Sequence, residues 1–211
     1  MSEQETAGSL NNSPSGYGGK PLILPVKGVM PTMGNNCFVA PNATIVGDVV
    51  MGDECSVWFN TVLRGDVNFI RMGNRVNVQD GAIIHCTYQK TGTTIGNNVS
   101  IGHNAIVHGC VIDDNVLIGM GAIVMDNVHV GSNSIIAAGS VVLENTKVES
   151  GTIYAGVPAK KLKDISQELI HGEINRIAEN YVMYSGWFKD PAPPILPPVG
   201  GEGNGEDQIR R

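Results

Sequence analysis

A six-residue spacing of large apolar side chains is the feature that most limits what this chain can fold into. Two positions before these side chains the residue is usually small or β-branched, as at Ala43, Val99 and Ala122. The six-residue runs are Val39, Ile45, Met51, Val57 and Leu63; Met72, Val78 and Ile84; Ile95, Ile101 and Val107; and Ile112, Ile118, Val124, Val130, Ile136, Val142, Val148 and Tyr154. A short fixed period is typical of solenoids, whose units pack only on their neighbours. We therefore expect a parallel β-helix in which three hexapeptides make one triangular coil of about 18 residues.

A glycine directly follows many of these apolar residues, at Gly52, Gly73, Gly96, Gly102, Gly119 and Gly131. A residue without a Cβ suits a tight bend, so we expect these glycines to mark the corners of the coils. The low aromatic content of 5% agrees with a thin interior. The pattern resembles that of the left-handed β-helix of hexapeptide-repeat proteins. We therefore expect an all-β domain over residues 21–158, lead-in included.

The two ends of the chain differ from the repeat. Residues 1–20 are rich in Ser, Gly and Asn, and residues 190–211 are rich in Pro and then Gly, so we expect a disordered N-terminal tail and a flexible C-terminal tail. Between the repeat and the second tail, large apolar residues recur at helical spacing. They are Ile165, Leu169, Ile170, Ile174, Ile177, Tyr181 and Val182. We predict a helix from about Asp164 to Lys189, within a region 159–189 that packs on the β-helix.

Charge and cysteine usage limit the partners. The formal net charge is −6, and the basic residues cluster only in the short AKKLK at 159–163. This pattern argues against binding to nucleic acid or to a membrane surface, and no apolar run approaches the roughly 20 residues of a membrane span. The four cysteines lack CxxC spacing, and no secretory signal precedes them. We expect a cytoplasmic protein with reduced cysteines that acts on a small molecule.

Two histidines occupy equivalent positions of adjacent predicted coils. His85 directly follows Ile84 and His108 directly follows Val107. Their strands should therefore lie about 4.7–4.9 Å apart, with both imidazoles on one outer face. His103 follows its apolar residue by two positions and belongs to another edge of the triangle.

A trimer would bring these histidines together, with His85 and His108 of one subunit meeting His103 of the next. Three neutral imidazoles and an open position are the donor set of catalytic zinc. His129 and His171 have no other histidine placed to share a metal with them, and we expect them at the surface.

The stretches RGDVNFIRMGNRVNVQDGAIIH and IGNNVSIGHNAIVHGCVIDDNVLIGMGA resemble those of the γ-class carbonic anhydrases. The resemblance implies a homotrimer that catalyses reversible hydration of CO₂ to bicarbonate by a metal-bound hydroxide at the subunit interface. It also implies that His85, His103 and His108 bind the metal, with two ligands from one subunit and one from its neighbour. Zn²⁺ is the expected ion, and Fe²⁺ or Co²⁺ would suit the same imidazoles.

The resemblance extends to further residues. It implies that Arg64, Asp66 and Asp80 form ion pairs across the trimer interface. Asn77 and Gln79 match polar groups near the metal, where Gln79 would orient the hydroxide, and Tyr181 matches a helix tyrosine that reaches the site. Simpler alternatives are an exposed pair for Arg64 and Asp66, a turn cap for Asn77 and core packing for Tyr181.

The chain departs from the best-studied γ-enzyme pattern at two positions that assist proton transfer. A glutamate just after the RxD element is replaced by Val67, and an acidic loop after the first histidine is replaced by CTYQKTGTT, which holds no carboxylate. Three other functions therefore stay open. They are a hexapeptide acyltransferase that uses one histidine as a general base, a CoA thioesterase, and a metal-binding homologue without turnover.

Overall fold

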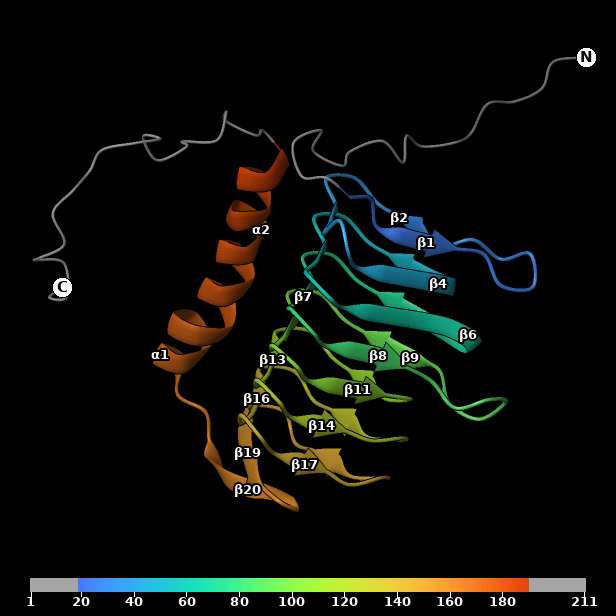
Figure 1. The fold of residues 1–211 in the computed structure, drawn as a ribbon. Coiled ribbons are helices and arrows are strands. Elements are labelled where there is room, and N and C mark those ends of the chain that lie inside the picture. The colour runs from blue at the N-terminus through green and yellow to red at the C-terminus, as the bar shows by residue number, and fades with distance from the viewer. Residues whose placement is uncertain (1–18, 190–211) are drawn as a thin grey trace, which may run out of the picture.

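A computed structural model of the chain describes residues 19–189. The predicted tails, 1–20 and 190–211, lie outside this range apart from Gly19 and Lys20. Short strands stack into a parallel solenoid, and one helical segment runs back along its side (Figure 1). The predicted β-helix with a C-terminal helix is confirmed.

The strands of the solenoid form two sheets. The 12-stranded sheet contains β1 (Leu22–Leu24), β2 (Thr32–Met33), β4 (Thr44–Met51), β6 (Val62–Met72), β8 (Ile83–His85), β9 (Thr93–Ile95), β11 (Ile106–His108), β12 (Val111–Ile112), β14 (Ile123–Val124), β15 (His129–Val130), β17 (Val141–Val142) and β18 (Lys147–Val148). The 8-stranded sheet contains β3 (Phe38–Val39), β5 (Ser56–Val57), β7 (Asn77–Val78), β10 (Ser100–Ile101), β13 (Val116–Ile118), β16 (Ser134–Ile136), β19 (Thr152–Gly156) and β20 (Ala159–Asp164).

The larger sheet covers two sides of the triangle. The long strand β6 pairs with β8 through Val62 and Leu63 and with β9 through residues 70–72, so it passes around a corner. The named strands pair in parallel except β19 and β20, which are antiparallel.

The interior of the solenoid is filled by the hexapeptide positions. From Ile45 to Tyr154 the six-residue apolar side chains are all buried, and Val39 at the open end is half-buried. They lie within strands, and the turns come after them. The small residues two positions earlier are buried as well, except Thr146, which is half-buried. A period of six therefore sets which side chains face inward.

The glycines after these apolar residues were predicted to allow tight bends at the corners of the coils, but the structure gives a different reason for them. Gly102 and Gly119 do not adopt positive φ angles. A Cβ at Gly102 would lie 2.7–2.9 Å from backbone atoms of the next coil, around Gly119. These glycines let successive coils approach closely. The left-handed turn positions are instead filled by other glycines and by asparagines, such as Asn98, Asn115 and Asn133.

The C-terminal region is divided into three helical segments and begins later than predicted. They are α1 (Gln167–Leu169), the π-helical η1 (Ile170–Asn175) and α2 (Arg176–Lys189). Residues 159–164 are not helical but form β20, which pairs with β19 at the last coil. Ser166 caps α1 by accepting a hydrogen bond from the Leu169 amide.

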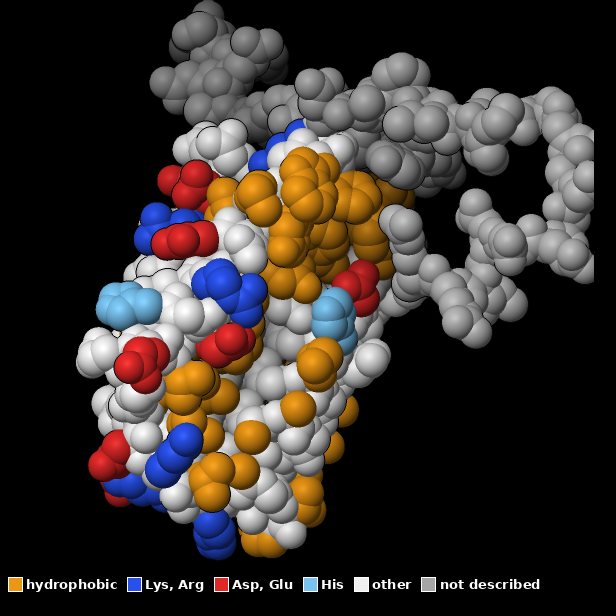
Figure 2. Space-filling model, turned by 90° about the vertical axis from the view of Figure 1, so that its left-hand side faces the viewer, with side chains coloured by type: hydrophobic (Ala, Val, Ile, Leu, Met, Phe, Trp, Pro, Cys, Tyr) orange, Lys and Arg blue, Asp and Glu red, His pale blue; other side chains and the backbone are white. Residues whose placement is uncertain are grey.

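Helix α2 packs on β5 and β7, near the N-terminal end of the solenoid (Figure 1). Trp58 lies at the centre of this contact, with its ring 5.2 Å from Tyr181 and 5.5 Å from Phe188. Figure 2 looks onto this side of the molecule, where hydrophobic side chains gather at the upper end. Within residues 19–189 no helix has the length and apolar character to cross a bilayer.

Candidate metal centre

His85 and His108 lie one above the other, as predicted. They are directly paired residues of β8 and β11, on adjacent coils. The Nδ1 atom of His85 lies 3.1 Å from the Nε2 atom of His108. Two nitrogen ligands about 2.0–2.1 Å from one tetrahedral zinc ion would be about 3.3 Å apart. The two imidazoles therefore fit a shared ion.

Each of these imidazoles presents its other nitrogen to a carboxylate. His85 Nε2 lies 3.1 Å from Asp66 Oδ1, and His108 Nδ1 lies 3.0 Å from Asp126 Oδ2. Asp66 also accepts a hydrogen bond of 2.6 Å from Arg64. A carboxylate on the second nitrogen fixes the tautomer and the ring orientation of a metal-binding histidine.

The ionisation of this group suits metal binding. Burial, with further contributions from Arg64 and His108, lowers the pKa of His85, which favours the neutral imidazole that a metal needs. Burial acts to raise the pKa of Asp66, but hydrogen bonds from Arg64 and His85 outweigh it and the pKa is lowered. Burial likewise opposes the hydrogen bonds from Thr91 and Thr87 to Asp126, and the net pKa is again lowered.

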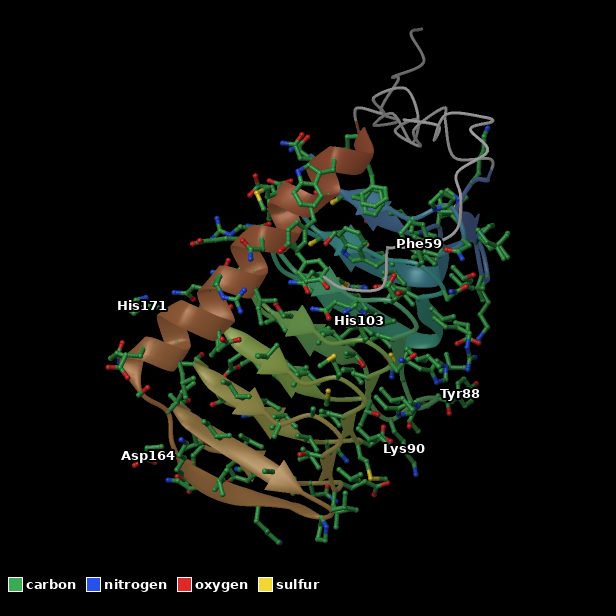
Figure 3. All side chains as sticks on the ribbon, turned by 60° about the vertical axis from the view of Figure 1, so that its left-hand side comes forward. Phe59, Tyr88, Lys90, His103, Asp164 and His171 are labelled. Carbon is green, nitrogen blue, oxygen red and sulfur yellow. The ribbon has the colours of Figure 1, made fainter. Side chains whose placement is uncertain are left out.

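His103 belongs to a second group of side chains, beside helix α2 (Figure 3). Its Nδ1 atom lies 3.0 Å from Asp80 Oδ2, and its Nε2 atom lies 3.5 Å from the Tyr181 hydroxyl. The Phe59 amide donates to the other oxygen of Asp80. Burial and the nearby Asp80 and Tyr184 raise the pKa of Tyr181 to about 12, so the hydroxyl keeps its proton at neutral pH.

Asn77 and Gln79 are buried polar side chains next to this second group. They flank the inward Val78 and so point away from the interior, toward the side covered by α2. Gln79 Nε2 donates to Asn77 Oδ1 at 3.0 Å, and Asn77 Nδ2 donates to Ser100 Oγ at 2.7 Å. Asn77 thus bonds to the neighbouring coil, and the interpretation of this residue as a turn cap is wrong.

The three predicted metal ligands do not lie together within one chain. His85 and His108 are paired, whereas His103 belongs to the separate group with Asp80 and Tyr181. Within residues 19–189 no three His, Cys, Asp or Glu side chains are placed to hold one metal ion. The ion pair of Arg64 and Asp66 lies within one chain, and its predicted extension across an interface stays a prediction.

The remaining histidines behave as expected. His129 and His171 are exposed, and His129 lies 3.0 Å from Asp113. Asp126 was missed by the sequence-based reasoning, although it follows His108 by 18 residues, the length of one coil. That spacing was the available signal. Thr87 and Thr91, which donate to Asp126, left no comparable signal because they lie in the segment that interrupts the repeat.

The structure shows the surroundings of the two positions at which the chain departs from the γ-enzyme pattern. Val67 is half-buried and packs on the core. The interruption after His85 is a short loop closed by an antiparallel bridge between Thr87 and Thr91. Neither position supplies a carboxylate to the site.

Comparison with known proteins gives close relatives. The Bacterial transferase hexapeptide (six repeats) family matches residues 30–65, 92–122 and 109–144. A carbonic anhydrase of Geobacillus kaustophilus is 45% identical over 168 residues, which cover 80% of this chain and 91% of that protein. The mitochondrial γ carbonic anhydrase 2 of Arabidopsis thaliana is 39% identical over 158 residues, 72% of this chain and 56% of that longer protein. The crystal structure of a Bacillus cereus protein described as a candidate acetyltransferase matches with a TM-score of 0.78 at 37% identity, covering 81% of this chain and 98% of that one.

Proposed function

The chain belongs to the hexapeptide-repeat family of the γ carbonic anhydrases, and from this premise we propose that it is a metal-dependent carbonic anhydrase. It interconverts CO₂ plus water with bicarbonate plus a proton, at a site shared by two subunits of a homotrimer. The observation that carries the proposal is the 3.1 Å approach of His85 Nδ1 and His108 Nε2. Two neutral imidazoles this close, each backed by a carboxylate, are arranged as ligands of one ion.

The exposed face beside these histidines supports self-association. On the side that carries β8 and β11, Ile83 and Ile106 point outward two positions before His85 and His108, and together with the residues paired to them on neighbouring coils they form an apolar column of five. It consists of Val62, Ile83, Ile106, Ile123 and Val141, which are paired from coil to coil. On the side that carries β9 and β12, the equivalent column is mostly polar: Arg71, Thr94, Val111, His129 and Lys147. The contrast between these two sides favours burial of the side with the apolar column against another copy.

Three-fold symmetry explains how the partial sites become complete. Head-to-tail contacts between identical subunits join two different surfaces, and they close into a ring when the rotation allows it. The apolar column with His85 and His108 would then meet the neighbour's surface that carries His103. Each ring would contain three equivalent sites.

The residues of the chain have separate tasks in this site. His85, His103 and His108 would hold Zn²⁺, or Fe²⁺ or Co²⁺ in its place. A zinc ion there supplies a Lewis acid that lowers the pKa of water to about 7. Gln79 is fixed by its hydrogen bond to Asn77 and would orient the nucleophile toward CO₂. The Tyr181 hydroxyl, 3.5 Å from His103 Nε2, stays protonated and can donate a hydrogen bond beside this ligand.

Proton release has no carboxylate relay in the positions where the best-studied γ enzymes have one. Val67 cannot carry a proton, and residues 86–92 hold no Asp or Glu. We therefore expect CO₂ hydration to depend strongly on the concentration of external buffer. The expected cytoplasmic location likewise stays a prediction.

The test is stopped-flow CO₂ hydration with protein of measured metal content. His108→Ala and His103→Ala should each abolish metal-dependent hydration, since each removes one ligand. His129→Ala is the matched control, because His129 forms a similar pair with Asp113 at 3.0 Å away from the site, and it should keep full activity. Unchanged hydration in His108→Ala would contradict the proposal.

Acyl transfer is the second candidate, because the Bacillus cereus structure is described as a candidate acetyltransferase. One histidine would then act as a general base toward an acyl acceptor, without a metal. Acetyl transfer from acetyl-CoA that survives a chelator would favour this candidate. Hydrolysis of CoA thioesters that requires the metal would instead indicate a thioesterase using the same three histidines, and bound metal without either reaction would indicate a homologue without turnover.

A further inference from the structure

We propose that Asp126, fastened by the segment 86–92, is the positioning carboxylate for the metal ligand His108. The inference rests on the proposed function and adds a task for the segment that interrupts the repeat. This segment, called the excursion below, leaves the solenoid directly after His85 and returns at Thr93.

Both carboxylate oxygens of Asp126 have hydrogen-bond partners. Oδ2 lies 3.0 Å from His108 Nδ1 and accepts its proton in the tautomer that leaves Nε2 directed at His85. Oδ1 accepts hydrogen bonds from the hydroxyls of Thr87, at 2.8 Å, and Thr91. The carboxylate is therefore held from the side opposite to the imidazole. Its orientation is set by the excursion and in turn sets the orientation of His108.

The excursion is itself tied down at several points. Thr87 and Thr91 exchange backbone hydrogen bonds of 3.1 and 3.3 Å, which close the loop. Asn68 Nδ2 donates to the Thr87 carbonyl at 3.3 Å. The Thr93 hydroxyl donates to the carbonyl of His85 at 2.8 Å. The excursion and Thr93, the residue directly after it, thus contact the backbone of His85 and the carboxylate that faces His108.

The residue after His108 leaves room for this arrangement. Gly109 has a positive φ of 52°, and a Cβ at this position would overlap Asp126 Oδ1 and Thr91 Oγ1. The absence of a side chain therefore lets the carboxylate and the threonine meet against the backbone.

His129 and Asp113 provide an internal comparison. They are also 3.0 Å apart, but their side chains are 50% and 38% exposed, against 30% and 22% for His108 and Asp126. The carboxylate of Asp126 is held by two hydroxyls as well as by its histidine. A carboxylate fixed in this way can direct a ligand, whereas an exposed pair contributes little.

The experiment compares Asp126→Ala with Asp113→Ala in the full-length protein. Zn²⁺ affinity is measured by competition with a chromophoric chelator, and the visible spectrum of the Co²⁺-substituted protein reports the coordination geometry. Asp126→Ala should weaken Zn²⁺ binding by about 10–100-fold and alter the Co²⁺ spectrum, as expected for loss of a carboxylate that orients a ligand. Asp113→Ala should change neither.

The excursion is tested by two double variants. Thr87→Val with Thr91→Val removes both hydroxyls and should reduce Zn²⁺ affinity, by less than Asp126→Ala does. Thr87→Ser with Thr91→Ser keeps the hydroxyls and should retain wild-type Zn²⁺ affinity. If the threonines acted only through packing of their methyl groups, this variant would lose affinity as well. These variants decide the matter if circular dichroism shows that Asp126→Ala does not fold.

The outcomes separate the inference from the function on which it rests. Tight Zn²⁺ binding and an unchanged Co²⁺ spectrum in both Asp126→Ala and the double valine variant would overturn the inference alone. Wild-type protein that binds none of Zn²⁺, Fe²⁺ and Co²⁺ would overturn the proposed function and the inference together.

Discussion

Gly119 and Gly121 are two residues apart in one coil, yet they are glycine for different reasons. A Cβ on Gly119 would overlap the backbone of Ala137 and Ala138 in the next coil. Gly121 has a φ of 66° with open space around it, and Asn104 occupies the same turn position one coil earlier. Gly119 is required by the close spacing of adjacent coils, and Gly121 is required by its left-handed backbone conformation.

Substitutions should separate these two reasons. Gly121→Ala should lower the free energy of unfolding by about 1–2 kcal/mol, the cost of a left-handed conformation, and Gly121→Asn by less, because Asn adopts it readily. Gly119→Ala should lower the free energy of unfolding by about 1–3 kcal/mol through overpacking, and Gly119→Asn should be at least as destabilising. Urea unfolding at one fixed protein concentration measures all four variants. Equal costs of Ala and Asn at position 121 would contradict the conformational explanation.

Cys37 is the one cysteine of the four whose thiol pKa is lowered. A hydrogen bond from the Cys55 side chain, together with the positive charge of Lys189, outweighs burial and lowers the pKa of the Cys37 thiol. Burial raises the pKa of Cys86 and Cys110. A thiolate reacts with alkylating agents and a thiol does not.

The pH dependence of alkylation follows from these directions. The thiolate fraction of Cys37 grows as pH rises through its lowered pKa, so labelling by iodoacetamide should reach half its maximal rate below about pH 8.5, the ordinary thiol value. Cys55→Ala removes the hydrogen bond and should move this midpoint upward. Mass spectrometry of labelled peptides identifies the site. A midpoint unaffected by Cys55→Ala would show that another group sets the pKa.

At the residue scale, the hexapeptide period was sufficient to place His85 above His108, because a parallel register carries equivalent positions from coil to coil. It also carried a signal for Asp126, which follows His108 by one coil length of 18 residues. It could not reveal that Asp66 contacts His85 or that Asp80 contacts His103, because neither aspartate lies 18 residues from its histidine.

Among the elements, helix α2 is attached through an aromatic seam. Trp58 on the solenoid is 6% exposed and its ring lies near those of Phe38, Tyr181 and Phe188. Trp187 on the same helix is 63% exposed. The seam also positions Tyr181, which reaches His103 from the helix.

Removing the central ring should therefore be far more damaging than removing the exposed one. Trp58→Ala should lower the free energy of unfolding by about 3–5 kcal/mol, as for other buried aromatic truncations. Trp187→Ala, the matched control, should stay within about 0.5 kcal/mol of wild type. Chemical denaturation followed by far-ultraviolet circular dichroism measures both. Similar losses in the two variants would mean that the helix is not held by this seam.

The C-terminal elements also show where sequence patterns stop being informative. The apolar stripe predicted the helix correctly, and Ile174 and Ala178 are buried against the solenoid. The strand β20 was not predicted, because only Ala159 in it is buried and the rest is mostly lysine. Its role comes from the whole fold: it covers the edge of the last coil, and lysines on an edge strand discourage further strands from adding.

For the whole molecule, the decisive question is whether the apolar column is the subunit interface. Ile83 lies between Val62 and Ile106 in that column and is 41% exposed, and Val111 on the polar side is 42% exposed. The two residues are alike in exposure and in their place on a strand but differ in their neighbours. They form a matched pair for charge insertion.

Ile83→Lys should prevent trimer formation, because burying an unpaired ammonium group among apolar side chains is costly. Val111→Lys should leave the trimer intact, because its neighbours Thr94 and His129 are polar. Light scattering after size-exclusion chromatography distinguishes a mass of one chain, 22.3 kDa, from about three times that mass. The monomeric Ile83→Lys protein should keep its strands in circular dichroism but lose tight Zn²⁺ binding, since a neighbour's His103 no longer completes the site. A trimeric Ile83→Lys protein would place the interface on another side of the solenoid and would separate His85 and His108 from it.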